Sequence, residues 1–415
     1  MNENNMKLDS AVGQLLSDDP HIAKECGAVS DTKGWGGKGE PCRLALAMMY
    51  EEGLGEDSFW HPYFASIPGE QTSPVNWSHE ELAGLESDVM IQMVLFLKNF
   101  LEKQYENTVP YLIKTYPEHF NAEKHTVDAL VRTTLMIWGR SFDSSAKDVA
   151  KPDRRTWSMI PFADLVNHQS YVESFFSDRD GSDQFACWAS ECFTPGAEIF
   201  QSYGSHKSTS HFFYYYGFIP GGYVTNDYIM FDFPVDQHPI RDHLTALTSG
   251  SDLVGFAGVD GHVTESFITG YRDVLRIKGA IPESDSDDGM GATLYKIKSA
   301  LEAKMYSLNT TYQEDLDKLA EGFTDFTTFT TLSIRTRYKF IMNKVIENLE
   351  HRIKTMPESP EGYKYDKMDW IFTYVDDEFT PDRLEHNCRD SMFKLTLPTT
   401  NVDYTNIKKN RAIQQ

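Results

Sequence analysis

The chain has 415 residues, of which 40% are hydrophobic, so it is long enough for two domains that each bury a core. Its 62 acidic residues outnumber its 39 basic residues and give a formal net charge of −23. This excess of negative charge argues against nucleic acid or an anionic membrane as the main partner, because both would be repelled. A basic segment of another protein would be attracted.

The cysteine pattern predicts neither a zinc site nor a disulfide framework. The cysteines stand at positions 26, 42, 187, 192 and 388 and form no Cys-x-x-Cys pair. We therefore expect reduced thiols in an intracellular, soluble protein. The N-terminus carries no charged-then-apolar signal pattern, and the longest apolar runs are too short to span a bilayer.

In chain order, the first 39 residues are polar and end in a glycine-rich stretch at 34–39. That stretch matches Gly-x-Gly-x-x-Gly, but no buried strand precedes it, so we interpret it as a loop and not as a nucleotide-binding turn. Apolar residues at helical spacing then predict three helices. These helices are expected from residue 41 to about 53, over 88–116 and over 127–142.

The region from 161 to 218 has short apolar runs instead. Two of them flank a turn at Asp180-Gly181 and predict a hairpin, and residues 199–200 predict a strand that ends by Gly204. Residues 212–218 then hold six aromatic side chains around one glycine. Such a density of rings fits either a hydrophobic core or an aromatic site.

After a strand-like run at 228–233 the composition changes, which predicts a domain boundary near residue 235. Helical spacing continues over 267–277 and 294–308, and Thr311-Tyr-Gln-Glu314 has the spacing of a capping box. A long helix is expected over 334–353, with the basic residues around 335–344 on a solvated face. The tail from residue 357 matches no pattern that we recognise.

Three ordered motifs resemble the SET-domain protein methyltransferases. They are Asp164-Leu-Val-Asn-His168, then Gly196-Ala-Glu-Ile-Phe-Gln-Ser-Tyr-Gly204, then Tyr216-Gly-Phe218. The resemblance is to the branch of the Rubisco large-subunit lysine methyltransferase, which also includes an actin histidine methyltransferase. Ser58-Phe-Trp-His-Pro-Tyr63 is similar to the S-x-W-x-P-Y segment of that branch and extends the match upstream.

The resemblance implies an α+β protein with two domains. A SET-type β fold is expected over 1–235, with a helical insert over about 60–143. An all-α domain resembling the substrate-binding domain of Rubisco methyltransferases is expected over 236–415. We expect a monomer, and the sequence leaves cytoplasm, nucleus and plastid open as compartments.

The resemblance also implies a site without a metal ion. Tyr203 would be the catalytic tyrosine and would line the lysine channel together with Tyr216 and Phe218. S-adenosyl-L-methionine would be held by five residues, which are Arg140, Asn167, His168, Tyr216 and Phe218. Moving a methyl group from a sulfonium to an amine is an in-line displacement, so the residues chiefly align the reactants and exclude water. Aromatic faces suit this task because they attract cations.

Two departures from the branch stand out. Its SET domains open with a pair of strands that carry Gly-x-Gly, and no such pattern precedes residue 7, so the opening strands are expected to be missing. Thr209 stands where the branch commonly has asparagine, which is expected to weaken a polar contact behind the pocket.

The predicted function is methyl transfer from S-adenosylmethionine to a lysine side chain of a protein substrate. One alternative is transfer to histidine on the same fold. A second is a binding module that keeps the channel but no longer holds the donor. A third is a metal hydrolase built on His168, although no second ligand lies at suitable spacing.

Overall fold

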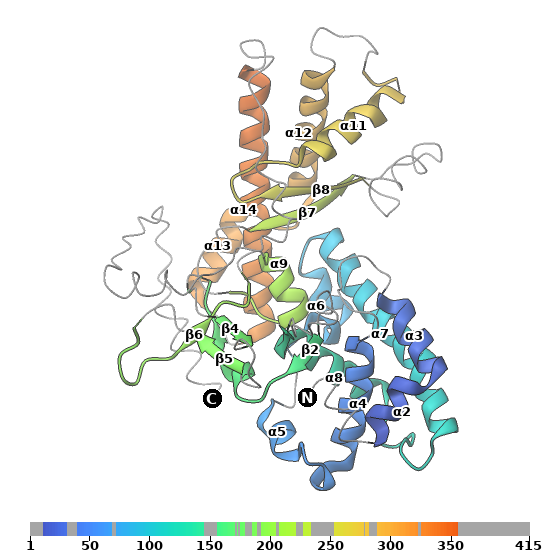
Figure 1. Ribbon diagram of the computed structural model, residues 1–415. Helices are drawn as coiled ribbons and strands as arrows, with labels where there is room; N and C mark the ends of the chain where they lie inside the picture. Colours follow the sequence, from blue (N-terminus) through green and yellow to red (C-terminus); the bar gives the residue numbers. More distant parts are fainter. Residues whose placement is uncertain are drawn as a thin grey trace. The chain divides into compact units, whose positions relative to one another are not determined.

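The computed structural model describes residues 11–30, 40–68, 72–144, 156–170, 172, 175–178, 185–188, 192–204, 207–220, 227–233, 253–277, 279–281, 289–322 and 325–355. The chain forms two compact units, and most of their helices and strands are labelled in Figure 1. The first unit comprises Met1–Trp77, Gln92–Ser205 and His211–Gly222. The second unit comprises Ser78–Ile91, His206–Ser210 and Tyr223–Gln415.

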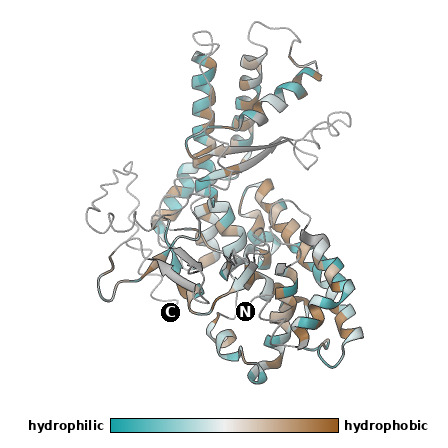
Figure 2. Cartoon of the chain, in the orientation of Figure 1, coloured by the Kyte–Doolittle hydropathy of each residue, from teal (hydrophilic) through white to brown (hydrophobic). Residues whose placement is uncertain are grey.

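Helices build most of the first unit. They are α2 (Ala11–Asp18), α3 (Pro20–Ser30), α4 (Glu40–Leu54), α5 (His61–Ser66), α7 (Asp88–Thr115), α8 (Val127–Arg140) and α9 (Thr209–His211), of which α7 and α9 begin in residues of the second unit. Every residue from Leu44 to Met49 is buried, so α4 is the central helix, with α2, α3 and α8 packed around it. Figure 2 shows hydrophobic and hydrophilic residues along the helices. No described helix is long and apolar enough to cross a membrane.

Three short strand pairs complete the first unit. The strands are β1 (Ser141–Ser144), β2 (Thr156–Met159), β3 (Asn167–His168), β4 (Phe175–Asp178), β5 (Phe185–Trp188) and β6 (Phe200–Gln201). β1 pairs with β2 and β4 with β5 in antiparallel fashion, whereas β3 and β6 are parallel. The β4–β5 pair confirms the predicted hairpin, although its turn lies outside the described residues.

Two local expectations need correction. The helix predicted over 127–142 ends at Arg140, because Ser141 takes an extended conformation and begins the strand that pairs with β2. Residues 11–30, for which no element was predicted, form α2 and α3. Asp19 separates these helices, and its carboxylate accepts hydrogen bonds from the backbone N–H groups of His21 and Ile22, as a helix N-cap does. The glycine-rich stretch at 34–39 lies outside the described residues.

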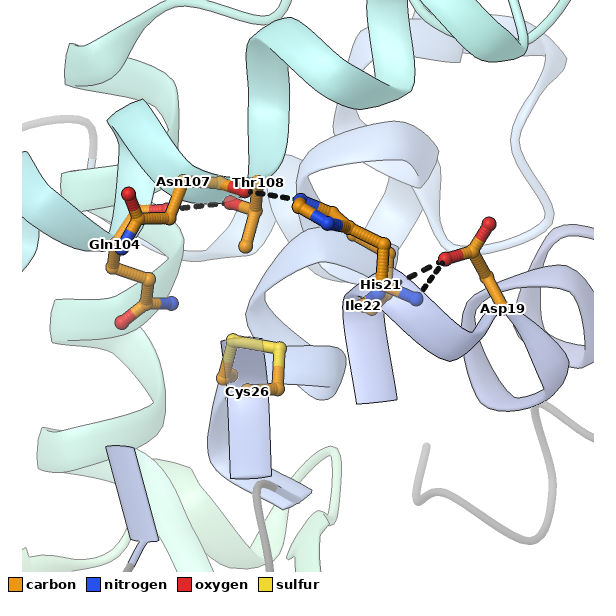
Figure 3. Close-up of a disulfide and its surroundings, with 8 residues drawn as sticks. Asp19, His21, Ile22, Cys26, Gln104, Asn107 and Thr108 are labelled. Carbon is orange, nitrogen blue, oxygen red and sulfur yellow. Dashed lines mark hydrogen bonds between the residues drawn. A yellow bond between two sulfur atoms is a disulfide. The ribbon is translucent and has the colours of Figure 1, made fainter. Parts of the chain in front are cut away.

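Cys26 and Cys42 are joined by a disulfide, which contradicts the expectation of reduced thiols. The bond links α3 to α4, and both cysteines are buried in the core of the first unit. Figure 3 shows this disulfide in a close-up that also draws Gln104 and Thr108 of α7. The separation of 16 residues gave no recognisable pattern, because a disulfide depends on how two helices approach each other in space.

Replacing Cys42 by serine is expected to lower the free energy of unfolding. Cross-linking a loop of this length restricts the unfolded chain and contributes about 3 kcal/mol in the chain-entropy model. Chemical denaturation of the oxidised protein and of Cys42→Ser measures the difference. Peptide mapping under non-reducing conditions is the control, and it should recover the two cysteine peptides as one linked species. Equal stability of the two proteins would contradict a cross-link between α3 and α4.

The second unit contains α6 (His79–Ala83), β7 (Tyr228–Phe233), β8 (Leu253–Gly258), α11 (Glu265–Ile277), α12 (Met290–Ser307), α13 (Tyr312–Glu321) and α14 (Phe326–Thr355). The predicted helices are confirmed here, and so is the capping box at Thr311 and Glu314. The expectation of an all-α second domain is wrong in one respect, because β8 pairs antiparallel with β7. Apolar residues of β7, β8, α11, α12 and α14 share one core.

A buried charge cluster replaces the solvated face expected around 335–344. The cluster consists of Lys339 and Arg335 of α14 with Glu86 and Asp315. The Lys339 ammonium is fully buried and lies 2.9 Å from Glu86 Oε2 and 2.7 Å from Asp315 Oδ2. Arg335 contacts the same two carboxylates. Two positive and two negative groups therefore neutralise one another, and the contact with Glu86 fixes the segment after α6 to α14.

Gly217 is required by its backbone conformation and by its surroundings. Its φ is +70°, and a Cβ placed there would lie 2.7 Å from the carbonyl carbon of Thr72. Gly217→Ala is expected to destabilise the protein by about 3 kcal/mol or more, since left-handed strain and a backbone clash add together. Gly55→Ala is the matched control, because Gly55 has φ +62° but nothing within 4 Å of the added carbon. Thermal unfolding that shows equal losses in both variants would contradict the clash.

Candidate active site

The parallel pairing of β3 with β6 brings the motifs together. Asn167 is opposite Phe200 and His168 is opposite Gln201, so the chain that leaves β6 passes His168 before it reaches Gly204. The backbone N–H of Tyr203 donates a hydrogen bond to His168 Nδ1 at 3.1 Å. Residues more than thirty positions apart in the sequence thus become direct neighbours.

Tyr203 is half-buried, and its phenol is held in place. The hydroxyl donates a hydrogen bond to the Val166 carbonyl oxygen at 2.8 Å, and Gln201 Nε2 donates to the same oxygen at 3.4 Å. Burial, together with the neighbouring Tyr216, raises the pKa of Tyr203 to about 12. The phenol is therefore neutral throughout the physiological pH range, and its oxygen lone pairs can accept a further hydrogen bond.

His168 is fixed in one tautomer by its two ring contacts. Because Nδ1 accepts the hydrogen bond from Tyr203 N–H, the proton of the neutral ring resides on Nε2, which lies 3.2 Å from Ser170 Oγ. The ring also stacks on Phe212 with centroids 4.5 Å apart. Both ring nitrogens are thus engaged within the protein, which weighs against the metal-hydrolase alternative. Among the described residues, no group of three or more potential ligands is placed to hold a metal ion.

The aromatic run forms a π-helical turn, η4 (Phe212–Tyr216), that ends at Gly217. Single π-helical turns of this kind are frequent at functional sites. The Tyr216 ring stacks on the Tyr203 ring with centroids 5.2 Å apart, and burial raises the pKa of Tyr216. Gly217 then turns the chain in the left-handed conformation, so that the Phe218 ring lies edge to face with the Tyr203 ring, with ring centroids 6.4 Å apart.

The run divides between core and site. Phe212, Phe213 and Tyr214 are buried, whereas Tyr216 and Phe218 are half-buried beside Tyr203. Tyr214 therefore belongs to the core. Tyr215 is half-buried, and its ring packs edge to face against Trp138 of α8.

Arg140 reaches the site from the end of α8. Its Nη1 donates a hydrogen bond to the Asp164 carbonyl oxygen at 3.2 Å and lies 3.5 Å from the carboxylate Oδ2 of the same residue. The Asp164 side chain has no exposed surface. The guanidinium of Arg140 therefore contacts a buried carboxylate and not an exposed one.

Two positions differ from the motif-based expectation. The Asn167 side chain is exposed, and its Nδ2 donates a hydrogen bond to Glu198 Oε1 at 2.6 Å. Thr209 is buried and donates its hydroxyl to Asp227 Oδ2 at 2.6 Å within the second unit. Threonine at this position thus makes a short hydrogen bond to a buried carboxylate, so the expected loss of a polar contact is offset.

Sequence reasoning missed the role of Tyr63. Its phenol donates a hydrogen bond to Asp164 Oδ2 at 2.8 Å, although 101 positions separate the two residues. Tyr63 is the last residue of the S-x-W-x-P-Y segment, and Asp164 is the first residue of the motif that ends at His168. The signal was therefore present in both motifs, but nothing in the sequence shows that they meet.

No protein-family model matches the chain. Among curated proteins, the N-lysine methyltransferase setd6 of Xenopus laevis is 27% identical over 197 residues, covering 44% of this chain and 40% of that protein. The chloroplastic Rubisco large-subunit N-methyltransferase of Pisum sativum is 21% identical over 364 residues, covering 80% of this chain and 70% of that protein. The actin-histidine N-methyltransferase of Dasypus novemcinctus is 27% identical over 182 residues, covering 42% of this chain and 29% of that protein. The chain thus spans about two fifths of the length of the setd6 proteins that it matches.

Solved structures show the same fold. Rubisco LSMT bound to AdoMet matches with a TM-score of 0.62 and 18% identity, over 93% of this chain and 86% of that chain. The SET domain of LSMT bound to lysine and AdoHcy matches with a TM-score of 0.61 and 17% identity over the same shares. Together with the sequence matches, this fold confirms the resemblance predicted from the motifs. The chain is thus similar in sequence and in fold to the group of SET-domain methyltransferases that includes Rubisco LSMT, setd6 and the actin-histidine methyltransferase.

Proposed function

We propose that the chain transfers a methyl group from S-adenosylmethionine to a lysine side chain of a protein substrate. The observation that carries this proposal is the Tyr203 phenol, which is anchored on the Val166 carbonyl and stacked on Tyr216. When bound, the cofactor supplies an electron-poor methyl group on a positively charged sulfur. The reaction further requires alignment of the reactants, exclusion of water and loss of the amine proton, and these residues would serve the alignment.

The residues at the site suit this cofactor. The faces of Tyr203, Tyr216 and Phe218 favour a sulfonium cation, and the Arg140 guanidinium favours a carboxylate. His168 presents one defined tautomer and so one defined hydrogen-bonding pattern. Asn167 would contribute through its backbone, because its side-chain amide is engaged with Glu198.

Tyr203 would orient the amine of the substrate and would not act as its base. Its hydrogen is donated to Val166, which leaves the phenol oxygen to accept a hydrogen bond from the amine. A phenol with a pKa of about 12 is already protonated at neutral pH and cannot take another proton. The amine is expected to lose its proton before transfer, helped by desolvation among the aromatic rings.

Methyl transfer to peptide arrays tests the proposal. The net charge of −23 favours basic peptides, so the array carries central lysines in basic surroundings, with arginine and histidine replacing lysine in matched spots. Tritium from labelled S-adenosylmethionine should appear in the lysine spots and be absent from the arginine spots. Label confined to histidine spots would replace lysine by histidine as the target. A folded sample that labels no spot and binds no donor would favour the binding-module alternative.

The pH dependence of transfer should follow the substrate amine. Because free lysine has a pKa near 10.4, the rate should rise about ten-fold per pH unit from about pH 7 to pH 9. No decline of the rate from titration of Tyr203 is expected in this range, since the pKa of Tyr203 in the folded protein is about 12. A rate that declines with an apparent pKa of about 8 would contradict the neutral phenol.

The same pKa affects stability at higher pH. Between about pH 10 and 12 the unfolded chain loses the phenol proton first, so the free energy of unfolding falls as the pH rises.

A further inference from the structure

The segment from Phe162 to Val166 carries two carbonyl groups that face functional side chains. The Asp164 carbonyl accepts a hydrogen bond from Arg140, and the Val166 carbonyl accepts one from Tyr203. The segment begins at Phe162 with a φ of +73°, a conformation that costs free energy for a side chain of this size. Such strain persists only where surrounding contacts determine the conformation, so the contacts that hold this segment matter for the site.

Tyr63 and Arg140 supply those contacts, because both bind Asp164 and each comes from a different element. The Tyr63 phenol, on α5, donates to Asp164 Oδ2 at 2.8 Å. The Arg140 guanidinium, at the end of α8, approaches the same carboxylate oxygen and the carbonyl. The carboxylate has no exposed surface, and its Oδ1 has no hydrogen-bond partner in the described part of the chain. Among the described residues, Tyr63 and Arg140 are thus the two polar side chains that contact the buried Asp164 carboxylate.

We propose that Tyr63 and Asp164 are positioning residues, whose phenol–carboxylate hydrogen bond fixes the Val166 carbonyl as the anchor for the Tyr203 hydroxyl. Neither residue needs to touch the reacting atoms. The proposal rests on the proposed function, which gives Tyr203 its task, and extends the site to a residue on α5.

Loss of the Tyr63 hydroxyl has a predictable electrostatic effect. Burial raises the pKa of the Asp164 carboxyl, and the hydrogen bond from Tyr63 and the charge of Arg140 lower it. The described groups that face this carboxyl are Tyr63, Arg140 and, at longer range, Tyr203. Without the Tyr63 hydroxyl, the Asp164 carboxyl is protonated at a higher pH. Its ion pair with Arg140 then weakens as the pH falls.

The chain offers a matched control for Tyr63→Phe. Tyr116 is also half-buried, and its phenol donates to the buried carboxylate of Asp19 at 2.7 Å, within the same unit but outside the site. We expect Tyr63→Phe to lower kcat about ten-fold to one hundred-fold at pH 9, with KM for a lysine peptide changed less than about three-fold. Tyr116→Phe should leave kcat of the folded protein unchanged.

The ratio of variant to wild-type kcat across pH separates positioning from a structural role, because titration of the substrate lysine cancels in that ratio. For Tyr63→Phe the ratio should fall further as the pH is lowered, and for Tyr116→Phe it should stay flat. In Tyr63→Phe combined with Asp164→Asn the pH dependence should vanish, because no carboxyl is left to titrate. A flat ratio for Tyr63→Phe, or an unchanged kcat, would overturn the proposal.

A readout that needs no activity keeps this test distinct from that of the proposed function. In protein with ¹³C-labelled tyrosine, the Tyr203 Cζ resonance, assigned with Tyr203→Phe, should shift in Tyr63→Phe and stay in place in Tyr116→Phe. If the wild type transfers no methyl group but this shift is seen, the proposed function fails and the positioning stands. An unmoved Tyr203 resonance in Tyr63→Phe overturns the positioning whatever the activity.

Discussion

Tyr203→Phe is expected to lower kcat on the order of 10²–10³-fold while the Kd for S-adenosylmethionine changes less than about three-fold. The substitution removes the hydroxyl that bonds to the Val166 carbonyl at 2.8 Å, and with it the oxygen that would hold the amine. The ring itself remains, so its stacking on Tyr216 and its face toward a cation are retained. Turnover should therefore decline without a matching loss of donor binding.

Tyr215→Phe is the matched control for this experiment. Tyr215 lies in the same π-helical turn, but its ring packs against Trp138 and His211 instead of Tyr203. Steady-state kinetics with a lysine peptide and calorimetry with the donor measure both variants. Unchanged turnover in Tyr203→Phe would contradict the role assigned to the phenol, and an equal decline in Tyr215→Phe would point to a general loss of structure.

Lys339→Ala is expected to lower the free energy of unfolding by about 3–5 kcal/mol, the range for breaking a buried ion pair. The ammonium has no exposed surface and contacts Glu86, Asp315 and the backbone carbonyl of Thr310. Its removal leaves two buried carboxylates for which Arg335 is the remaining positive partner among the described residues. Free energy is lost because two buried negative charges are then balanced by one positive charge.

Lys354→Ala is the control on the same helix. Lys354 pairs with Glu350 near the end of α14, but its side chain is 70% exposed, so water already screens the pair. Denaturant unfolding should show a large loss for Lys339→Ala and almost none for Lys354→Ala. A small loss in both would mean that the cluster is solvated, as the sequence alone suggested.

Helices with a regular apolar stripe were predictable because each depends on local spacing. α7 and α12 begin and end within a few residues of the expected ranges. α14 also ends close to the expected residue, but it starts eight positions earlier, at Phe326. α2 and α3 were missed because they are short, at 8 and 11 residues, and depend on packing against α4. The strand β8 was missed because its partner, β7, had been assigned to the other domain.

The site was predictable in its composition but not in its contacts. Motifs identified Tyr203, His168 and Tyr216 as neighbours in function, and the structure brings their rings together. The parallel pairing of β3 with β6 is set by tertiary packing, so the hydrogen bond between Tyr203 N–H and His168 could not be read from spacing. The same reason hides the bond between Tyr63 and Asp164.

Binding of S-adenosylmethionine, measured by titration calorimetry on the folded wild-type chain, tests the central claim most directly. We expect saturable heat with one donor per chain and a Kd that rises at least about ten-fold in Phe218→Ala, because that variant removes one face of the aromatic wall beside Tyr203. Circular dichroism and thermal unfolding would show that both proteins are folded. A folded wild type that gives no heat at any donor concentration would contradict the assignment of this site as a methyl-transfer centre.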